Sequence, residues 1–139
     1  MQQEMVEVAK KIALLVTGAA VQKCMMQLPE EQEIMGLLSD MAIEVFAMES
    51  GLLRALKKMA KSTDEKAQIQ KAMVKVYVNA AFGRVGSYAR QVFAAIAEGD
   101  ALKQHLAALD KITAFTPINT IALRREVANY TIKLGRYPW

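Results

Sequence analysis

Apolar side chains between residues 34 and 59 recur at steps of three or four, and this spacing constrains the fold more than any other feature. The stripe comprises Ile34, Leu38, Met41, Val45, Met48, Leu52, Leu56 and Met59. Such steps place side chains on one face of an α-helix. The carboxylates of Glu30, Glu31 and Glu33 suit the exposed amides of a helix start, and three lysines suit its end. We therefore predict a long amphipathic helix that starts at these glutamates and ends with Lys57, Lys58 and Lys61.

An earlier helix is predicted over residues 2–27. Its apolar positions also follow helical steps and comprise Met5, Val8, Ile12, Leu15, Ala19 and Met26. Leu28 and Pro29 end it, because proline has no amide hydrogen and disfavours a helical residue before it. The chain is therefore expected to turn at this point.

Ser62 and Glu65 match a capping box, in which each side chain satisfies an unpaired amide of the other's turn. A third helix is expected to start there and to end at Gly99 and Asp100. Apolar residues occur on nearly every side of it between residues 69 and 96, so we predict that it is the most enclosed helix.

Two shorter helices follow in the prediction. Leu102, Leu106, Leu109 and Ile112 indicate the first, with Asp100 as its cap. Thr116 and Pro117 indicate a restart, since threonine caps well and proline is tolerated at the first helical position. The last helix is predicted over residues 117–134, with Gly135 as its terminator and residues 136–139 as a tail.

These helices predict an all-α fold, an up-down four-helix-type bundle of three long helices and a split fourth. No stretch has a strand's period of two without also fitting a helix, and Asn-Gly and Asp-Gly turns are absent. A length of 139 residues and a hydrophobic content of 53% suit one domain, residues 1–139.

The cellular setting predicted from composition is the cytoplasm. A single cysteine cannot form an internal disulfide, which favours a reducing compartment. The longest uncharged apolar stretch, residues 12–21, is about half the ~20 residues that a membrane-spanning helix needs. We therefore expect neither a signal peptide nor a transmembrane helix.

Residues that could support chemistry are few, and each has a structural interpretation that we favour. His105 is the only histidine and Leu102 precedes it by three, which excludes di-iron and histidine-rich zinc sites. We expect His105 to be structural rather than a lone base, and Cys24 to be inert and half-buried. Asp40 and Glu44 lie one helical turn apart, and Glu49 follows. We expect these acids to face solvent or a neighbouring arginine rather than to form a catalytic pair.

Small and basic residues likewise predict no ligand site. Gly83 and Gly86 lack the strand and the further glycines of a phosphate-binding loop, so we interpret them as sites of close helix approach. Arg84 and Arg90 are expected at a solvated surface rather than on an acidic partner. The basic doublets at residues 10–11, 57–58 and 124–125 are dispersed without interleaved aromatics, which argues against nucleic-acid binding. We thus predict no catalytic, cofactor-binding or metal-binding residue in this chain.

Three strings in the chain resemble a known family. EQEIMGLLSDMAIEVFAMESGLLRALKKM (31–59) is similar to a helix in the C-terminal extension of very-long-chain-type acyl-CoA dehydrogenases. AFGRVGSYARQVFAAIAEGD (81–100) resembles the next helix of that extension, and LRREVANYTIKLGRYPW (123–139) resembles the aromatic C-termini of bacterial members. The likeness runs through nearly the whole chain, in the same order.

The resemblance implies a structural role within a larger flavoprotein. Members of this family oxidise an acyl-CoA thioester to its trans-2-enoyl form in fatty-acid β-oxidation and pass electrons onward from bound FAD. Their FAD-binding segments and glutamate base have no matching positions in this chain, so it is expected to be part of a longer protein or a truncated product. The implied partner is the catalytic domain of the parent chain, together with a homo-oligomer and peripheral contact with the inner face of a membrane.

Two other functions remain open at this point. The chain could be a free-standing helical dimerisation or adaptor module, which would pair through an exposed apolar stripe of its first helix. It could also be a small acyl- or CoA-binding bundle, although no convergent polar groups frame a pocket in the sequence.

Overall fold

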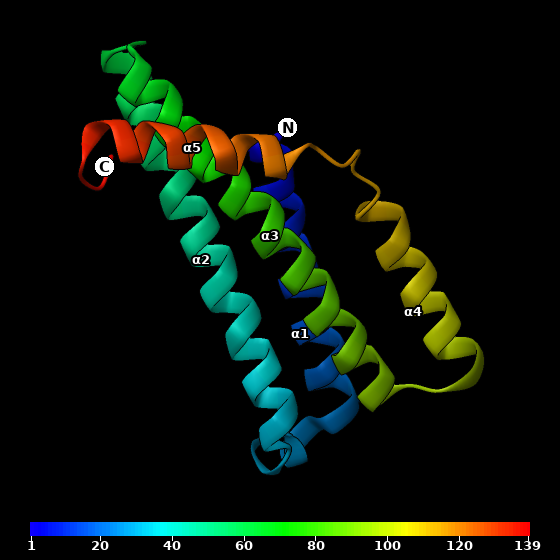
Figure 1. Cartoon of the computed structure of the whole chain (residues 1–139). Helices are drawn as coiled ribbons and strands as arrows, with labels where there is room; N and C mark the ends of the chain where they lie inside the picture. The colour runs from blue at the N-terminus through cyan, green and yellow to red at the C-terminus, as the bar shows by residue number, and fades with distance from the viewer.

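Helices follow one another along the chain without any strand (Figure 1). The computed structural model describes all 139 residues. Its elements are α1 (Gln2–Cys24), the 3-10 helix η1 (Met25–Glu30), α2 (Gln32–Lys61), α3 (Glu65–Ile96), α4 (Gly99–Ile112) and α5 (Thr120–Leu134). The all-α prediction is confirmed.

Helices α1, α2 and α3 lie side by side and enclose most of the core (Figure 1). The predicted stripe of α2 faces this core, with Ile34, Met41 and Met48 buried, but its member Leu56 is exposed and Ala55 is buried instead. Helix α3 contacts all four other α-helices and has the most buried residues, as predicted. Alanines on α1 and α3 are among the residues without any exposed surface, so the helices can approach closely. The fully buried alanines are Ala9, Ala20, Ala81 and Ala89.

The buried face of α1 differs in part from the predicted stripe. Met5 and Ile12 are buried as expected, but Leu15 and Met26 are exposed, and Val16 and Ala20 are buried instead. Because α1 is apolar on most sides, a helical stripe can be drawn through it in several ways, and only contact with α2 and α3 selects one.

Helix α1 ends at Cys24, three residues before the predicted end. Met25 has a positive φ of 50°, and η1 then continues through Pro29 to Glu30. The ring of a proline clashes with the carbonyl of the residue four before it. For Pro29 that residue is Met25, which explains why the α-helix ends where it does.

Together, α1 and η1 have the length and the mean hydropathy, 1.2, of a helix that could cross a membrane. Only 17% of the apolar window that carries this signal is buried. A single helix of this kind is weak evidence, because the test rests on length and composition alone, so this finding does not assign a membrane span.

Helix α3 begins at the predicted position with a different cap. The N-cap is Asp64, whose Oδ1 accepts a hydrogen bond from the Ala67 amide at 2.8 Å. The Ser62 hydroxyl accepts from the Asp64 amide at 3.2 Å instead of capping the helix. The predicted capping box is therefore wrong. With Asp64 as the cap, Glu65 is the first helical residue and does not stand three positions after it.

The predicted fourth helix is split into α4 and α5, with shifted starts. Gly99 begins α4 with a φ of +61°, and Asp100 lies in the first turn rather than at the cap. Helix α5 begins at Thr120, not at Pro117, because Asn119 Oδ1 accepts from the Ala122 amide at 3.0 Å. Gly135 ends α5 in the left-handed conformation, φ 75°, as predicted.

The two parts of the split helix lie at opposite ends of α3. Helix α5 crosses α3 near its start, whereas α4 runs back beside its last turns (Figure 1). The ring of Phe93 on α3 stacks on the imidazole of His105 on α4, and Arg90 pairs with Asp110 further along. These two contacts show that α4 is antiparallel to α3.

Candidate functional site

The most elaborate polar cluster joins α2 to α3. Glu44 accepts hydrogen bonds from Arg84 at both carboxylate oxygens, with Nε–Oε1 2.7 Å and Nη2–Oε2 3.0 Å. The Tyr77 hydroxyl donates to Oε2 at 3.0 Å, and the Arg84 guanidinium lies 5.7 Å from the centre of the Tyr77 ring. Glu44 therefore pairs with an arginine on a neighbouring helix, as predicted. Arg84 was expected at a solvated surface without a partner, and that expectation is wrong.

Charge and burial within this cluster shift the pKa values of Glu44 and Tyr77. Hydrogen bonds from Arg84 lower the pKa of Glu44 below its ordinary value, against the opposing effect of burial. Burial raises the pKa of Tyr77, and its bond to Glu44 raises it further. At neutral pH the cluster thus consists of a carboxylate, a guanidinium and a neutral phenol. A carboxylate held this way by two donors is a helix-to-helix clamp rather than a general base.

Protonation of Glu44 should weaken this clamp. Because the pKa of Glu44 is lower in the folded than in the unfolded protein, its ionised form stabilises the folded state at pH values above the unfolded pKa. This stabilisation is lost as the pH falls through the folded pKa. We expect Glu44→Gln to lower the free energy of unfolding by about 1 kcal/mol at neutral pH, because Arg84 is 41% exposed and solvent screens the pair. Urea unfolding at pH 7 and pH 3 measures this, and the difference from wild type should shrink at the lower pH. Asp40→Asn, one turn away at an exposed position, is the matched control. A difference that is the same at both pH values would contradict the assignment.

Asp40 and Glu49 of α2 are not brought together with Glu44. Asp40 is exposed, in agreement with the expectation for this position. Glu49 pairs with Lys10 of α1, which also contacts Glu7. Glu44 and Glu49 thus serve separate helix contacts, and the three acids do not form a pair that could share a proton.

His105 and Cys24 have the surroundings of structural residues. The His105 ring is half-buried and parallel to the Phe93 ring, with centroids 4.5 Å apart and planes at 6°. Cys24 is half-buried at the end of α1 and packs on the hydrophobic core. No group of three His, Cys, Asp or Glu side chains is placed to hold a metal ion.

The two glycines of α3 do not mediate close helix approach, which contradicts the interpretation from sequence. A Cβ built at Gly83 or at Gly86 would meet no atom within 4 Å. Arg90, between them and the end of α3, is exposed at the surface as expected, and it pairs there with Asp110. Within this chain the glycines therefore reduce helix stability without a packing benefit.

We expect Gly83→Ala to raise the free energy of unfolding by about 0.5–1 kcal/mol. The added methyl meets open space, and alanine restricts the unfolded chain more than glycine does. The same substitution at Gly135 should lower stability by about 1 kcal/mol, because its φ of +75° disfavours any residue with a Cβ. Thermal unfolding followed by circular dichroism measures both. A loss of stability in Gly83→Ala would mean that the methyl is not accommodated.

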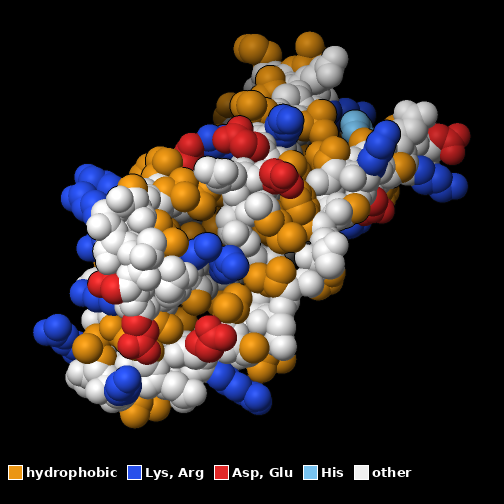
Figure 2. Space-filling view, turned by 90° about the horizontal axis from the view of Figure 1, so that it is seen from above, with side chains coloured by type: hydrophobic (Ala, Val, Ile, Leu, Met, Phe, Trp, Pro, Cys, Tyr) orange, Lys and Arg blue, Asp and Glu red, His pale blue; other side chains and the backbone are white.

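Basic side chains are spread over the molecule rather than gathered into a patch. Figure 2 shows Lys and Arg side chains scattered around the face seen from above. Lys10 is engaged by Glu7 and Glu49, while the doublets at residues 57–58 and 124–125 are exposed. This distribution differs from the continuous basic stripe of a nucleic-acid-binding surface.

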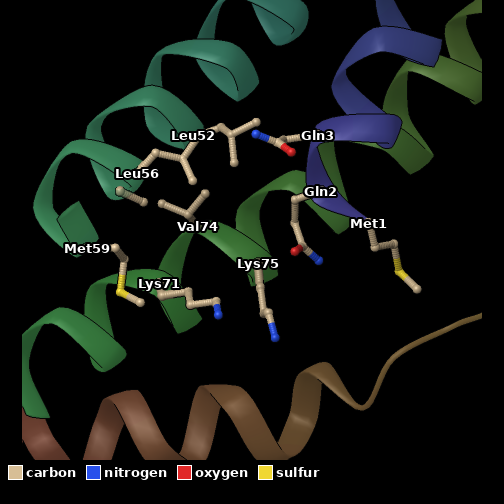
Figure 3. Close-up of a pocket in the computed structure, with 10 residues that line it drawn as sticks. Met1, Gln2, Gln3, Leu52, Leu56, Met59, Lys71, Val74 and Lys75 are labelled. Atoms are coloured by element: carbon tan, nitrogen blue, oxygen red, sulfur yellow. The ribbon is translucent and has the colours of Figure 1, made fainter. Parts of the chain in front are cut away.

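Two surface cavities are lined mainly by apolar side chains. One, of about 200 Å³, lies between the start of α1, the end of α2 and the first turns of α3 (Figure 3). Lys71 and Lys75 lie beside it with Leu52, Leu56 and Val74, and no acid lines it. A larger groove of about 670 Å³ lies between α2 and α3 and is bordered by Arg54, Tyr137 and Trp139. The first cavity contains two lysines and the groove contains Ser50 and Tyr77, and neither is lined by a histidine, a cysteine or a carboxylate.

Docking of the C-terminal tail is the feature that sequence reasoning missed. The buried Gln70 side chain of α3 donates to the Pro138 carbonyl at 3.0 Å. The Arg54 guanidinium of α2 lies 5.2 Å from the centre of the Trp139 ring, a cation–π contact. A proline and two aromatics in four residues were the available signal, but periodicity does not detect such a segment.

Comparison with protein families gives one match, to the family described as acyl-CoA dehydrogenase, C-terminal domain, over residues 8–111. This range includes α2, α3 and nearly all of α4, and it ends before α5. A curated relative, a probable acyl-CoA dehydrogenase of Bacillus subtilis (strain 168), is 38% identical over 132 residues.

A solved structure has the same fold over almost the whole chain. It is an acyl-CoA dehydrogenase from Bacillus anthracis in complex with FAD, 35% identical, and it superposes with a TM-score of 0.95 over 98% of this chain. The chain spans 22% of the length of the Bacillus subtilis relative and 24% of the Bacillus anthracis chain. In both, the matching region is one part of a much longer protein.

Proposed function

Because the chain belongs to the family of acyl-CoA dehydrogenase C-terminal domains, we propose that residues 1–139 work as one non-catalytic helical domain of an FAD-dependent acyl-CoA dehydrogenase. The reaction of such a parent is oxidation of an acyl-CoA thioester to trans-2-enoyl-CoA in fatty-acid β-oxidation. The observation that carries the proposal is the match to 24% of an FAD-bound dehydrogenase at a TM-score of 0.95.

The residues of this chain do not fit FAD. A pyrophosphate is usually held by free amides at a helix start or by a basic cradle. The side chains of Asp64 and Asn119 already occupy the starts of α3 and α5. The starts of α1, α2 and α4 have no side-chain cap, but Glu4, Glu33 and Asp100 in their first turns would repel a phosphate. The cavity beside Lys71 and Lys75, about 200 Å³, is smaller than the sites that hold drug-sized ligands. The α2–α3 groove, about 670 Å³, has one basic side chain, Arg54, which faces the Trp139 ring. In this proposal FAD is therefore held by the other three-quarters of the parent.

The proposed role is to brace the catalytic part of the parent. Long helices joined by buried apolar contacts and by the Glu44–Arg84 clamp form a stiff support. We propose the catalytic domain as the partner, within a homo-oligomer in the cytoplasm. We also propose peripheral contact with the inner face of a membrane. The exposed apolar side chains of α1 support contact with another surface.

A full-length chimera tests this function. It consists of the Bacillus subtilis relative with its matching 132 residues replaced by this chain. We expect the chimera to bind FAD and to reduce an artificial electron acceptor with acyl-CoA, and the 139-residue chain alone to do neither. The same protein without the chain should release FAD at a lower temperature. Turnover by the isolated chain would refute the non-catalytic role, and unchanged FAD release would refute bracing.

A free-standing dimerisation or adaptor module is the second candidate, favoured by the exposed Leu14, Leu15 and Val21 on α1. In that case the purified chain would pair through α1. Sedimentation at increasing protein concentration distinguishes the two functions, because a chain that stays monomeric contradicts the adaptor.

A further inference from the structure

One side of the molecule, made by α1 and α2, is apolar and exposed. We call it the α1/α2 face, and it consists of Leu14, Val21, Met35, Phe46 and Leu53. Leu14 is 75% exposed and Phe46 73%, which is far more than a side chain in a finished core retains. Large apolar side chains that are exposed next to one another often belong to interaction surfaces.

The register of the two helices places these residues together. Lys10 of α1 contacts Glu49 of α2, so the two positions lie side by side on antiparallel helices. Leu14 lies one turn beyond Lys10, and Phe46 lies one turn before Glu49, which makes Leu14 and Phe46 neighbours across the seam.

The remaining members of the face continue these rows along each helix. Val21 follows Leu14 by two turns, and Leu53 follows Phe46 by two turns. Met35 precedes Phe46 by three turns. The face is therefore a strip along much of the length of both helices, interrupted by Gly18, Ser39 and Glu49.

The charges next to this strip are paired. Residues 12–22 of α1 include no charged side chain. On α2, Glu44 is turned to Arg84 of α3. Glu49 lies in the row between Phe46 and Leu53 and pairs with Lys10 of α1, and their side chains remain 40% and 33% exposed. Burial of the strip therefore has to keep this ion pair intact, because an unpaired buried charge is costly.

We propose that the α1/α2 face docks onto the catalytic part of the acyl-CoA dehydrogenase chain, an inference that rests on the proposed function above. Roughly three-quarters of each relative lies outside the region that matches this chain, since the chain spans 22% of one and 24% of the other. The proposed contact buries the apolar side chains of the α1/α2 face, which is favourable in proportion to their area. The Lys10–Glu49 ion pair lies at the seam of this face and stays paired on docking.

Cysteine accessibility in the full-length chimera tests the docking. Leu14→Cys and Phe46→Cys are made separately in a Cys24→Ser background, in the chimera and in the 139-residue chain, and maleimide labelling of each position is followed by mass spectrometry. We expect both cysteines to react at least about tenfold more slowly in the chimera, because labelling then requires undocking. The control is Ile132→Cys on α5, at a position 78% exposed, which should react at the same rate in both proteins.

The outcomes separate this inference from the proposed function. A chimera that binds FAD and turns over, but in which Leu14→Cys and Phe46→Cys react as fast as in the isolated chain, overturns the docking face alone. A folded chimera without FAD or activity overturns the proposed function. Protection in the isolated chain that grows with its concentration would assign the face to a second copy instead. Protection by anionic vesicles but not in the chimera would assign it to a lipid surface.

Discussion

Replacing Phe93 with alanine should lower the free energy of unfolding by about 3–5 kcal/mol, the largest effect that we expect from one substitution. The Phe93 side chain has no exposed surface, and its ring stacks on His105. The variant loses the transfer free energy of the ring and leaves a cavity among α-helices that cannot close fully. Since domains of this size are stable by about 5–15 kcal/mol, much of the total would be lost.

Urea unfolding followed by circular dichroism at 222 nm measures the effect of Phe93→Ala. The matched control is Phe46→Ala, the same chemical change at a position 73% exposed, and in the isolated chain it should shift stability by no more than about 0.5 kcal/mol. Equal effects at Phe93 and Phe46 would contradict the burial described here.

Replacing Leu109 with alanine should detach α4 and cost about 2–5 kcal/mol of local stability. Leu109 is the only buried residue of α4, and it belongs to the same core cluster as Phe93. The remaining contacts of α4 are weaker. They are the Phe93–His105 stack, the half-buried Leu102 and Ile112, and the ion pair of Arg90 with Asp110, whose side chains are about half exposed. With the Leu109 anchor gone, α4 should open while α1, α2 and α3 stay folded.

Hydrogen exchange with mass spectrometry resolves this local effect of Leu109→Ala. Amides of residues 99–112 should lose protection, whereas those of α3 between Val78 and Val92 should keep theirs. Ile132→Ala, at an exposed position of α5, is the control and should leave both regions unchanged. A uniform loss of protection along the chain would show that α4 is an integral part of the core.

Prediction from sequence succeeded where one physical signal dominated. Helix α2 has a single apolar stripe with acids before it and lysines after it, so Ile34, Met41 and Met48 were correctly placed in the core. Gly135 was likewise identified as the terminator of α5, since few residues other than glycine adopt its φ of 75° readily. The family was also identified from sequence strings alone, and the match over residues 8–111 confirms it.

Errors arose where two residues offered similar local chemistry. Asp64 and Ser62 both cap well, and so do Asn119 and Thr116, and the chain's path between helices decides which one is used. On α1, Leu15 and Val16 are equally apolar, so the buried one is set by contacts with the other helices. For Glu44 the sequence predicted an arginine on a neighbouring helix but not which arginine, because Arg84 lies forty residues away in sequence.

The docked tail has a practical consequence for spectroscopy. Trp139 is the only tryptophan, and its indole nitrogen is shielded from water beneath the α2–α3 groove. Fluorescence excited at the red edge of the tryptophan absorption band therefore reports on the C-terminal tail rather than on the whole molecule. An emission change that precedes the loss of far-ultraviolet ellipticity during denaturation would record release of this segment as a separate early event.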